Sequence, residues 1–301
     1  NPQWEDRDYF VMSKGHAGPA LYAALALKGY FPVEQLLTIN TNGTRLPSHP
    51  DRNSTTGVDM STGSLGQGIS AAVGMALAGK LAKKDYRVYA LLGDGEIAEG
   101  QVWEAAMSAA KYHLDNLCAV VDVNGLQIDG PTAKVMNSEP LDQKMDAFGF
   151  NTIICNGNSL ADLEQAFILF DRSHGSGKPT CFLLHTTKGL GVSFMENAVD
   201  WHGKAPNDAE YDKAMAELRA SYEVMDNKSI ATRDSYGAAL LELADAGHDD
   251  IVVFDADLSA STRTSVFAKK YSERFFDCGI AECNMVGVAA GMSTFGYVPF
   301  V

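Results

Sequence analysis

The chain has 301 residues, which is enough for two ordinary domains and rules out a small disulfide-stabilised scaffold. Hydrophobic residues make up 46% of the sequence and charged residues 21%, as in soluble α/β proteins, so a largely disordered chain is excluded. The 24 Lys and Arg against 38 Asp and Glu give a formal charge of −14, which repels nucleic acid and anionic lipid unless a local basic pocket overrides it.

Helical and strand-like segments alternate along the whole chain. Helices are expected where small and apolar residues recur at helical spacing, and buried strands where short runs are apolar and rich in Val. In chain order the predicted elements are a helix over 17–27, a helix over 69–81, a strand over 87–92, a helix over 102–112, strands over 117–121 and 151–154, a helix over 160–170, a strand over 180–184, helices over 208–219 and 235–246, and a strand over 250–254. This alternation predicts an α/β fold with parallel sheets flanked by helices.

A domain boundary is expected near residue 225. The segment 211–227 is charged and helical in pattern, and a fresh series of helix and strand patterns begins at Ser229. We therefore expect one domain over residues 1–225 and the beginning of a truncated second α/β domain over residues 226–301. The chain opens without Met and ends on an apolar, strand-like run, so we also expect both ends to be cut.

The five cysteines are an odd number, and no CxxC spacing or neighbouring histidine indicates a zinc site. They are expected to be reduced and mostly buried. No apolar run approaches the ~20 residues that span a bilayer, and the first residues lack signal-peptide character. A cytoplasmic location is therefore expected.

Polar residues follow two of the predicted strands. Gly93-Asp94-Gly95 comes after the strand over 87–92, and Asn124-Gly125 comes after the strand over 117–121. Taken singly, each is a common turn signal. A right-handed crossover between the two strands would bring Asp94 and Asn124 to one crevice at the carboxyl ends of the sheet. A carboxylate, an amide oxygen and a backbone carbonyl can hold Mg²⁺ when phosphate oxygens complete the octahedron, so the expected ligand is a diphosphate.

The stretch from Asp94 to Asn124 resembles the thiamine diphosphate motif, and Gly-Asp-Gly-Glu-Ile-Ala-Glu-Gly at 93–100 is similar to its transketolase version. Other stretches follow the order of that family: Ser13-Lys14-Gly15-His16, Ser48-His49-Pro50, residues 61–68, Trp201-His202-Gly203, Ala231-Thr232-Arg233, Asp255-Ala256-Asp257-Leu258 and Gly279-Ile280-Ala281-Glu282. The resemblance covers essentially the whole chain and is closest to transketolases encoded as two subunits. It implies the thiamine diphosphate-binding fold, with a diphosphate-binding domain over 1–225 that lacks its N-terminal helix, then the start of a pyrimidine-binding domain. The chain would be a natural fusion or two joined pieces.

The resemblance also implies roles for individual residues. The implied ligands of Mg²⁺, Ca²⁺ or Mn²⁺ are Asp94, Asn124 and the carbonyl of Leu126. The implied catalytic residues are Glu282, which would hydrogen-bond the aminopyrimidine of the cofactor, His49 and His202. The implied cofactor contacts are His16, Gly63, Leu65, Asp94, Gly95, Glu99, Asn124, His202 and Glu282. The implied substrate contacts are His16, His49, His202, Arg233 and Ser261.

The function implied is that of a transketolase, which transfers a two-carbon ketol unit from a ketose phosphate to an aldose phosphate in the pentose phosphate pathway. The implied assembly is a homodimer or a two-subunit heterotetramer. One alternative is another thiamine enzyme such as a deoxyxylulose-phosphate synthase, which Trp201-His202-Gly203 disfavours. The other is a non-catalytic cofactor-binding fragment or paralogue, because part of the family's active site would lie outside residues 1–301. Ser64 and Cys283 depart from common family residues, and the role of His185 stays open.

Overall fold

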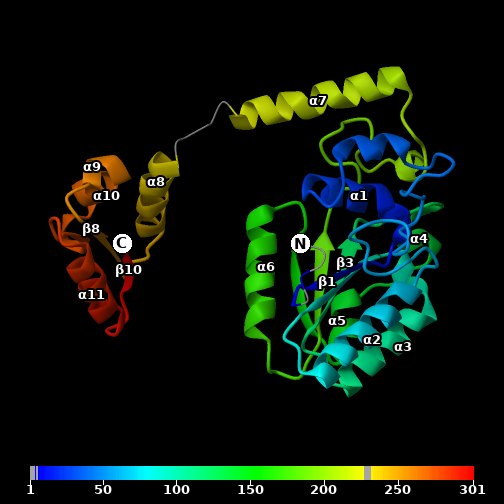
Figure 1. The fold of residues 1–301 in the computed structure, drawn as a ribbon, viewed down its shortest axis with the longest axis horizontal. Helices are drawn as coiled ribbons and strands as arrows, with labels where there is room; N and C mark the ends of the chain where they lie inside the picture. Colours follow the sequence, from blue (N-terminus) through cyan, green and yellow to red (C-terminus); the bar gives the residue numbers. More distant parts are fainter. Residues whose placement is uncertain (1–3, 5, 227–231) are drawn as a thin grey trace. The chain divides into compact units, whose positions relative to one another are not determined.

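The structure is a computed structural model that describes residue 4, residues 6–226 and residues 232–301 (Figure 1). The chain divides into two compact units, Asn1–Glu217 and Leu218–Val301. The observed division therefore lies within helix α7 (Asp208–Asp226). The boundary expected near residue 225 would lie at the end of that helix, next to residues 227–231, which lie outside the described residues. The division into a diphosphate-binding and a pyrimidine-binding domain remains a prediction.

The first unit is built on a five-stranded sheet with the order β1-β2-β3-β7-β6, in which every neighbouring pair is parallel. The strands are β1 (Tyr9–Met12), β2 (Val88–Gly93), β3 (Leu117–Val123), β6 (Asn151–Asn156) and β7 (Thr180–His185). The sequence predicted four of them and missed the four-residue edge strand β1. The expected α/β fold with a parallel sheet is confirmed.

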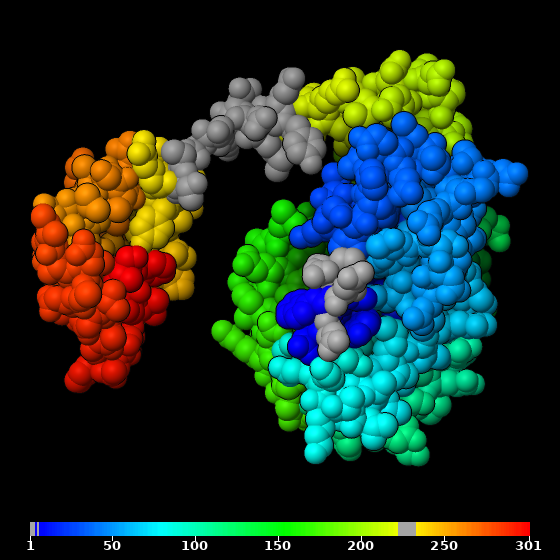
Figure 2. Space-filling view, in the orientation of Figure 1, coloured from blue at the N-terminus to red at the C-terminus, as the bar shows by residue number. Residues whose placement is uncertain are grey.

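Helices cover both faces of this sheet (Figure 1). Helices α2 (Gln67–Ala82), α3 (Gly100–Lys111) and α5 (Leu141–Ala147) cover one face, and α6 (Leu160–Arg172) covers the other. Two further helices, α1 (Gly18–Leu27) and α4 (Thr132–Val135), pack mainly on connecting segments. The shorter elements are the 3₁₀ helices η1 (Gly15–Ala17), η2 (Val33–Thr38), η3 (Glu96–Ala98) and η4 (Val199–His202), and the hairpin strands β4 (Leu126–Gln127) and β5 (Gly130–Pro131). In the space-filling view, the segment after α1 and helix α2 form a continuous surface, coloured blue to cyan (Figure 2).

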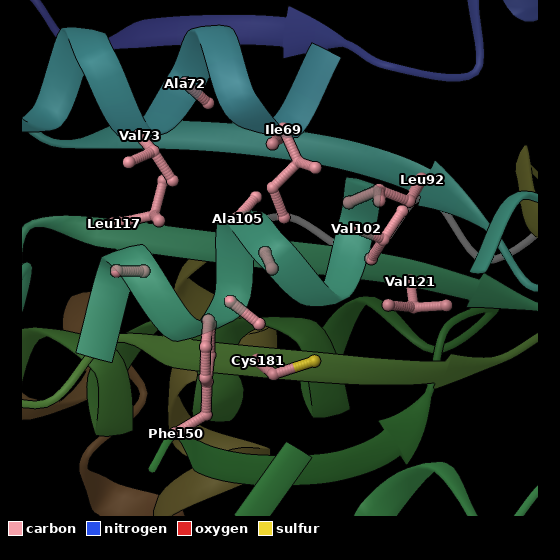
Figure 3. Close-up of a cluster of buried hydrophobic side chains, with 14 of the residues drawn as sticks. Ile69, Ala72, Val73, Leu92, Val102, Ala105, Leu117, Val121, Phe150 and Cys181 are labelled. Atoms are coloured by element: carbon pink, nitrogen blue, oxygen red, sulfur yellow. The ribbon is translucent and has the colours of Figure 1, made fainter. Parts of the chain in front are cut away.

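The alternation of side chains along β3 gives the sheet two buried faces. Leu117, Ala119 and Val121 join a cluster with residues of α2 and α3, whereas Cys118 and Val120 join a second cluster with residues of α6. Figure 3 shows Ile69, Ala72 and Val73 of α2 beside Val102 and Ala105 of α3 over the strands. Each large apolar side chain buried in this way stabilises the fold by about 1.5–3 kcal/mol. The core therefore holds the carboxyl ends of β2 and β3 firmly in place.

The second unit is a smaller α/β layer. Strand β8 (Ile251–Asp255) lies between β10 (Val298–Phe300) and β9 (Phe275–Asp277), again with parallel pairing. Its helices are α8 (Thr232–Asp245), α9 (Ser259–Thr262), α10 (Ser265–Lys270), the 3₁₀ helix η5 (Ser272–Arg274) and α11 (Glu282–Ser293). Strand β8 and helix α8 were predicted from the sequence. Within the described ranges, none of the helices has the length and apolar character needed to cross a bilayer.

Candidate functional site

A pocket of about 1090 Å³ opens in the first unit, where β1, β2, β3 and β7 end. This is where parallel α/β sheets bind ligands, because the loops that leave neighbouring strands diverge there. The predicted site residues that line it are His16, His49, Gly63, Leu65, Asp94, Gly95, Asn124, Leu126 and His202. The fold thus gathers residues from positions 16 to 202 in one place, as the sequence analysis expected.

Asp94 lies at the end of β2 and is almost completely buried. Its Oδ1 accepts a hydrogen bond from the Gly95 amide at 2.8 Å, and its Oδ2 accepts one from the Gly125 amide at 2.6 Å. Burial raises the pKa of Asp94, although the two amide bonds oppose this shift. Asn124 accepts a bond from the Leu126 amide at 3.0 Å through Oδ1. Backbone amides of the turn after β3 therefore donate hydrogen bonds to both candidate metal ligands, Asp94 and Asn124.

A second carboxylate, Asp122, is already neutralised within the protein. It forms an ion pair with Lys14 and accepts hydrogen bonds from Thr186 Oγ1 and from Asn124 Nδ2. Burial alone would raise the pKa of Asp122, but the charge and hydrogen bond of Lys14 keep it below its usual value. The bond to Asn124 Nδ2 also fixes which way the amide of Asn124 is turned.

Asp94, in contrast, has no ion-pair partner among the residues that the structure describes. A buried carboxylate without a cation, next to the amide oxygen of Asn124, fits a hard divalent ion. Over the same residues there is no group of three His, Cys, Asp or Glu that could hold a metal. The residues present therefore fit a metal whose coordination is completed by oxygens of a bound ligand.

Basic groups that were not selected from the sequence line the same pocket. Lys14 follows β1 and Lys188 follows β7. Lys188 Nζ lies 3.3 Å from His202 Nδ1, and the rings of His202 and His16 are 5.1 Å apart between centroids. Burial and the charge of Lys14 lower the pKa of Lys188. This basic lining in a chain of negative net charge fits a small, highly charged anion.

Two glycines allow the walls of the pocket to approach each other. A Cβ on Gly15 would lie 2.8 Å from the backbone nitrogen of Gly63, so the segment of His16 packs directly on the segment of Gly63. A Cβ on Gly95 would lie 3.2 Å from the Cβ of Gln127. A side chain at either position would push apart segments that carry residues of the pocket lining.

His16 is expected to remain neutral at physiological pH. Partial burial and the neighbouring His202, Lys14 and Lys188 lower its pKa to about 4. Because the unfolded chain binds this proton near pH 6.5, the folded protein should lose stability as the pH falls from about 6.5 towards 4. An NMR titration of the ring, assigned with a His16→Asn variant, should show a midpoint near 4. A midpoint near 6.5 would contradict this picture of the pocket.

Glu99 does not line the pocket. It is exposed at the N-cap of α3, and a Cβ on Gly66 would lie 2.6 Å from its Cβ, so it covers the loop before α2. His185 ends β7 with an exposed side chain and also lies outside the pocket lining. The expected contact between Glu99 and the cofactor therefore stays a prediction.

Arg233, Ser261 and Glu282 belong to the second unit, and all three are exposed. The loop that carries Ser261 is held by Asp255, which accepts bonds from Leu258 N at 2.6 Å, Thr262 Oγ1 at 2.7 Å and Thr264 Oγ1 at 2.8 Å. Arg263 Nε donates to Asp234 Oδ1 at 2.5 Å, which ties this loop to the residue after Arg233.

These hydrogen bonds link the segments of Arg233 and Ser261 within the second unit. Glu282 is the first residue of α11, where a negative charge is favoured by the helix dipole.

Residues 1–273 match the family model described as "Transketolase, thiamine diphosphate binding domain". The chain belongs to the transketolase family. It is 50% identical over 218 residues to the 6-deoxy-6-sulfo-D-fructose transketolase subunit SqwG of Clostridium sp. (strain MSTE9), covering 72% of this chain and 78% of that protein. It is 37% identical to the transketolase of Mus musculus over 98% of this chain and 51% of that protein.

The solved transketolase of Campylobacter jejuni has a similar fold, with a TM-score of 0.62 and 28% identity over all of this chain and 57% of that one. The family resemblance and the thiamine diphosphate-binding fold expected from the sequence are thus confirmed. The chain spans about half the length of the mouse transketolase.

Proposed function

We propose that this chain forms the cofactor-binding part of a transketolase, which transfers a two-carbon ketol unit from a ketose phosphate to an aldose phosphate. The observation that carries the proposal is the buried Asp94, which has no ion-pair partner in the described part of the chain and lies beside Asn124 in a pocket that also contains Lys14 and Lys188. A metal diphosphate requires a carboxylate that can bind the metal and positive side chains near its phosphate oxygens, and this pocket contains both. The family match supports the same cofactor.

Individual residues would bind the cofactor as follows. Asp94, Asn124 and the carbonyl of Leu126 would hold Mg²⁺, or Ca²⁺ or Mn²⁺, against the diphosphate. Lys14 and Lys188 would offset the remaining negative charge. Backbone amides around Gly95 would face the phosphate oxygens, and Gly63 and Leu65 would contact the aminopyrimidine. Glu99 would contribute indirectly, from its position over Gly66.

Thiamine diphosphate, when bound, would supply the carbon–carbon bond chemistry. The chain's own residues would bind the sugar and handle its protons. A neutral His16 can donate from one ring nitrogen and accept at the other, and His49 and His202 would hydrogen-bond the reacting hydroxyls and stabilise negative charge on their oxygens. The Glu282 carboxyl would share a proton with the pyrimidine ring of the cofactor. Arg233 and Ser261 would bind the terminal anion of the substrate.

Ketol transfer is the direct test of this activity. Xylulose 5-phosphate as donor and ribose 5-phosphate as acceptor should give product only with thiamine diphosphate and Mg²⁺ present. A parallel assay with 6-deoxy-6-sulfofructose as donor addresses a second candidate, because a relative at 50% identity is named for that sugar. The assays should be run with this chain alone and together with the remainder of a transketolase. No transfer from either donor under any of these conditions would leave cofactor binding without catalysis.

We further propose that the active assembly is a homodimer or a two-subunit heterotetramer in which one subunit binds the diphosphate and its partner binds the aminopyrimidine. Asp94 and Glu282 lie in different units of the chain, which permits such sharing. A cytoplasmic location and a role in the pentose phosphate pathway complete the proposal. The cytoplasmic location is supported by the buried, unpaired thiols of Cys118 and Cys181, which suit a reducing compartment.

Mixing two inactive variants tests the shared site. Asp94→Ala and Glu282→Gln chains, mixed in equal amounts under conditions of subunit exchange, should regain about a quarter of the original activity. About half of the dimers would be mixed, and each mixed dimer would contain one intact site of two. A mixture that stays inactive after mass spectrometry has confirmed exchange would show that both groups act in the same subunit.

A further inference from the structure

The side chain of Glu96, two residues after Asp94, is only 3% exposed and carries a carboxylate with no ion-pair partner in the described part of the chain. It lies in η3 and helps to line the pocket. Burying a carboxylate is costly unless several donors satisfy it. A glutamate at this buried position therefore needs hydrogen-bond donors from the protein, which a surface glutamate does not.

Three donors from three separate segments satisfy the Glu96 carboxylate. Oε1 accepts hydrogen bonds from Ser13 Oγ at 2.5 Å and from the Gly66 amide at 2.9 Å, and Oε2 accepts one from the Gly93 amide at 3.0 Å. Ser13 follows β1, Gly66 is the N-cap of α2, and Gly93 ends β2. One side chain thus fastens three segments that are far apart in the sequence.

Each of these donors stands directly before or after a residue of the pocket wall. Ser13 precedes Lys14, Gly66 follows Leu65, and Gly93 precedes Asp94. The packing is tight, since a Cβ on Gly68 would lie 2.5 Å from Ser13 Oγ. A shift at Glu96 would therefore be transmitted to a lysine, to the loop before α2 and to a candidate metal ligand together.

We propose that Glu96 is a positioning residue for the bound cofactor, because it joins the ends of β1 and β2 and the start of α2 into one cradle for the metal diphosphate. The inference rests on the proposed function. In this role Glu96 acts through Lys14, Leu65 and Asp94, whose relative positions decide how well the diphosphate is held.

A Glu96→Gln variant has the same shape but can no longer satisfy all three donors. If the amide oxygen faces Gly93, the amide NH₂ faces the Gly66 N–H, and if the oxygen faces Ser13 and Gly66, the NH₂ faces the Gly93 N–H. In either orientation one buried backbone amide loses its acceptor, and hydrogen bonds to a charged acceptor are among the stronger ones. We expect the Kd for thiamine diphosphate with Mg²⁺ to rise ~10-fold or more.

Calorimetry of cofactor binding at 25 °C provides the test, with Glu164→Gln on the exposed surface of α6 as the matched control. The Kd and the KM for the cofactor should rise in Glu96→Gln while kcat at saturating cofactor stays near its original value, and the control should change neither. An unchanged Kd together with a lower thermal midpoint would indicate a purely structural role and would overturn the proposal. A lower kcat with an unchanged Kd would overturn it as well.

A second variant covers the case in which Glu96→Gln does not fold. Ser13→Ala removes only the hydrogen bond from Ser13 Oγ to Oε1 and leaves the carboxylate in place, so we expect a Kd increase of about 3- to 10-fold. An unchanged Kd in Ser13→Ala would then contradict the proposal. If the unsubstituted protein binds no thiamine diphosphate, the proposed function itself fails. If it binds the cofactor and the variants bind it equally well, only the role of Glu96 fails.

Discussion

Replacing Asp94 with Ala should abolish thiamine diphosphate binding, with a rise in Kd of ~100-fold or more at Mg²⁺ concentrations that saturate the unsubstituted protein. The variant loses the carboxylate that we assign to the metal, so the metal loses its charged ligand. It also leaves the Gly95 and Gly125 amides without the acceptor that now aligns them. Isothermal titration calorimetry with and without Mg²⁺ measures the effect.

Two further variants make this test specific. Asp94→Asn keeps the size of the side chain and removes its charge, so a similar loss would assign the effect to metal binding rather than to packing. Asp212→Ala, on the exposed surface of α7, is the matched control and should bind normally. Unchanged affinity of Asp94→Ala in the presence of Mg²⁺ would show that the metal assignment is wrong.

Replacing Glu282 with Gln should lower kcat for ketol transfer by ~10²–10⁴-fold, the usual range for loss of a general acid–base group, and leave the Kd for the cofactor nearly unchanged. The glutamine keeps the shape of the side chain but cannot share a proton with the pyrimidine ring. The diphosphate, bound in the first unit, should still provide most of the affinity.

Stopped assays at saturating cofactor give kcat, and calorimetry gives Kd. Glu273→Gln, an exposed glutamate in η5 of the same unit, serves as the control. A Glu282→Gln variant with normal kcat would remove this residue from the catalytic machinery.

The parts of the fold that could be predicted from the sequence are those with strong local patterns. Strands β2, β3 and β7 are apolar over most of their length because helices cover both faces of the sheet. Strands β1 and β9 have only four and three residues, which is too short for a distinct pattern. Helix α11 consists largely of small residues and has no clear apolar stripe, so it was missed although its first residue, Glu282, was noted.

The candidate site could be predicted where its residues directly follow a strand. Asp94 and Asn124 were found in this way, because the end of a parallel strand is a position that sequence patterns reveal. Lys14 and Lys188 were not selected, since a lysine is ordinarily exposed and only the folded chain shows Lys14 paired with Asp122. Glu96 was missed because its three donors lie at residues 13, 66 and 93.

A crystal structure of the chain grown with thiamine diphosphate and Mn²⁺ would show directly whether Asp94 and Asn124 hold the metal of the cofactor, since Mn²⁺ takes the same oxygen ligands as Mg²⁺ and gives an anomalous signal. We predict a single strong anomalous peak per pocket, within coordination distance of Asp94, Asn124 and the carbonyl of Leu126, with the diphosphate beside Lys14 and Lys188. Cofactor density elsewhere on the chain, or a metal that does not contact Asp94, would contradict the proposed cofactor site.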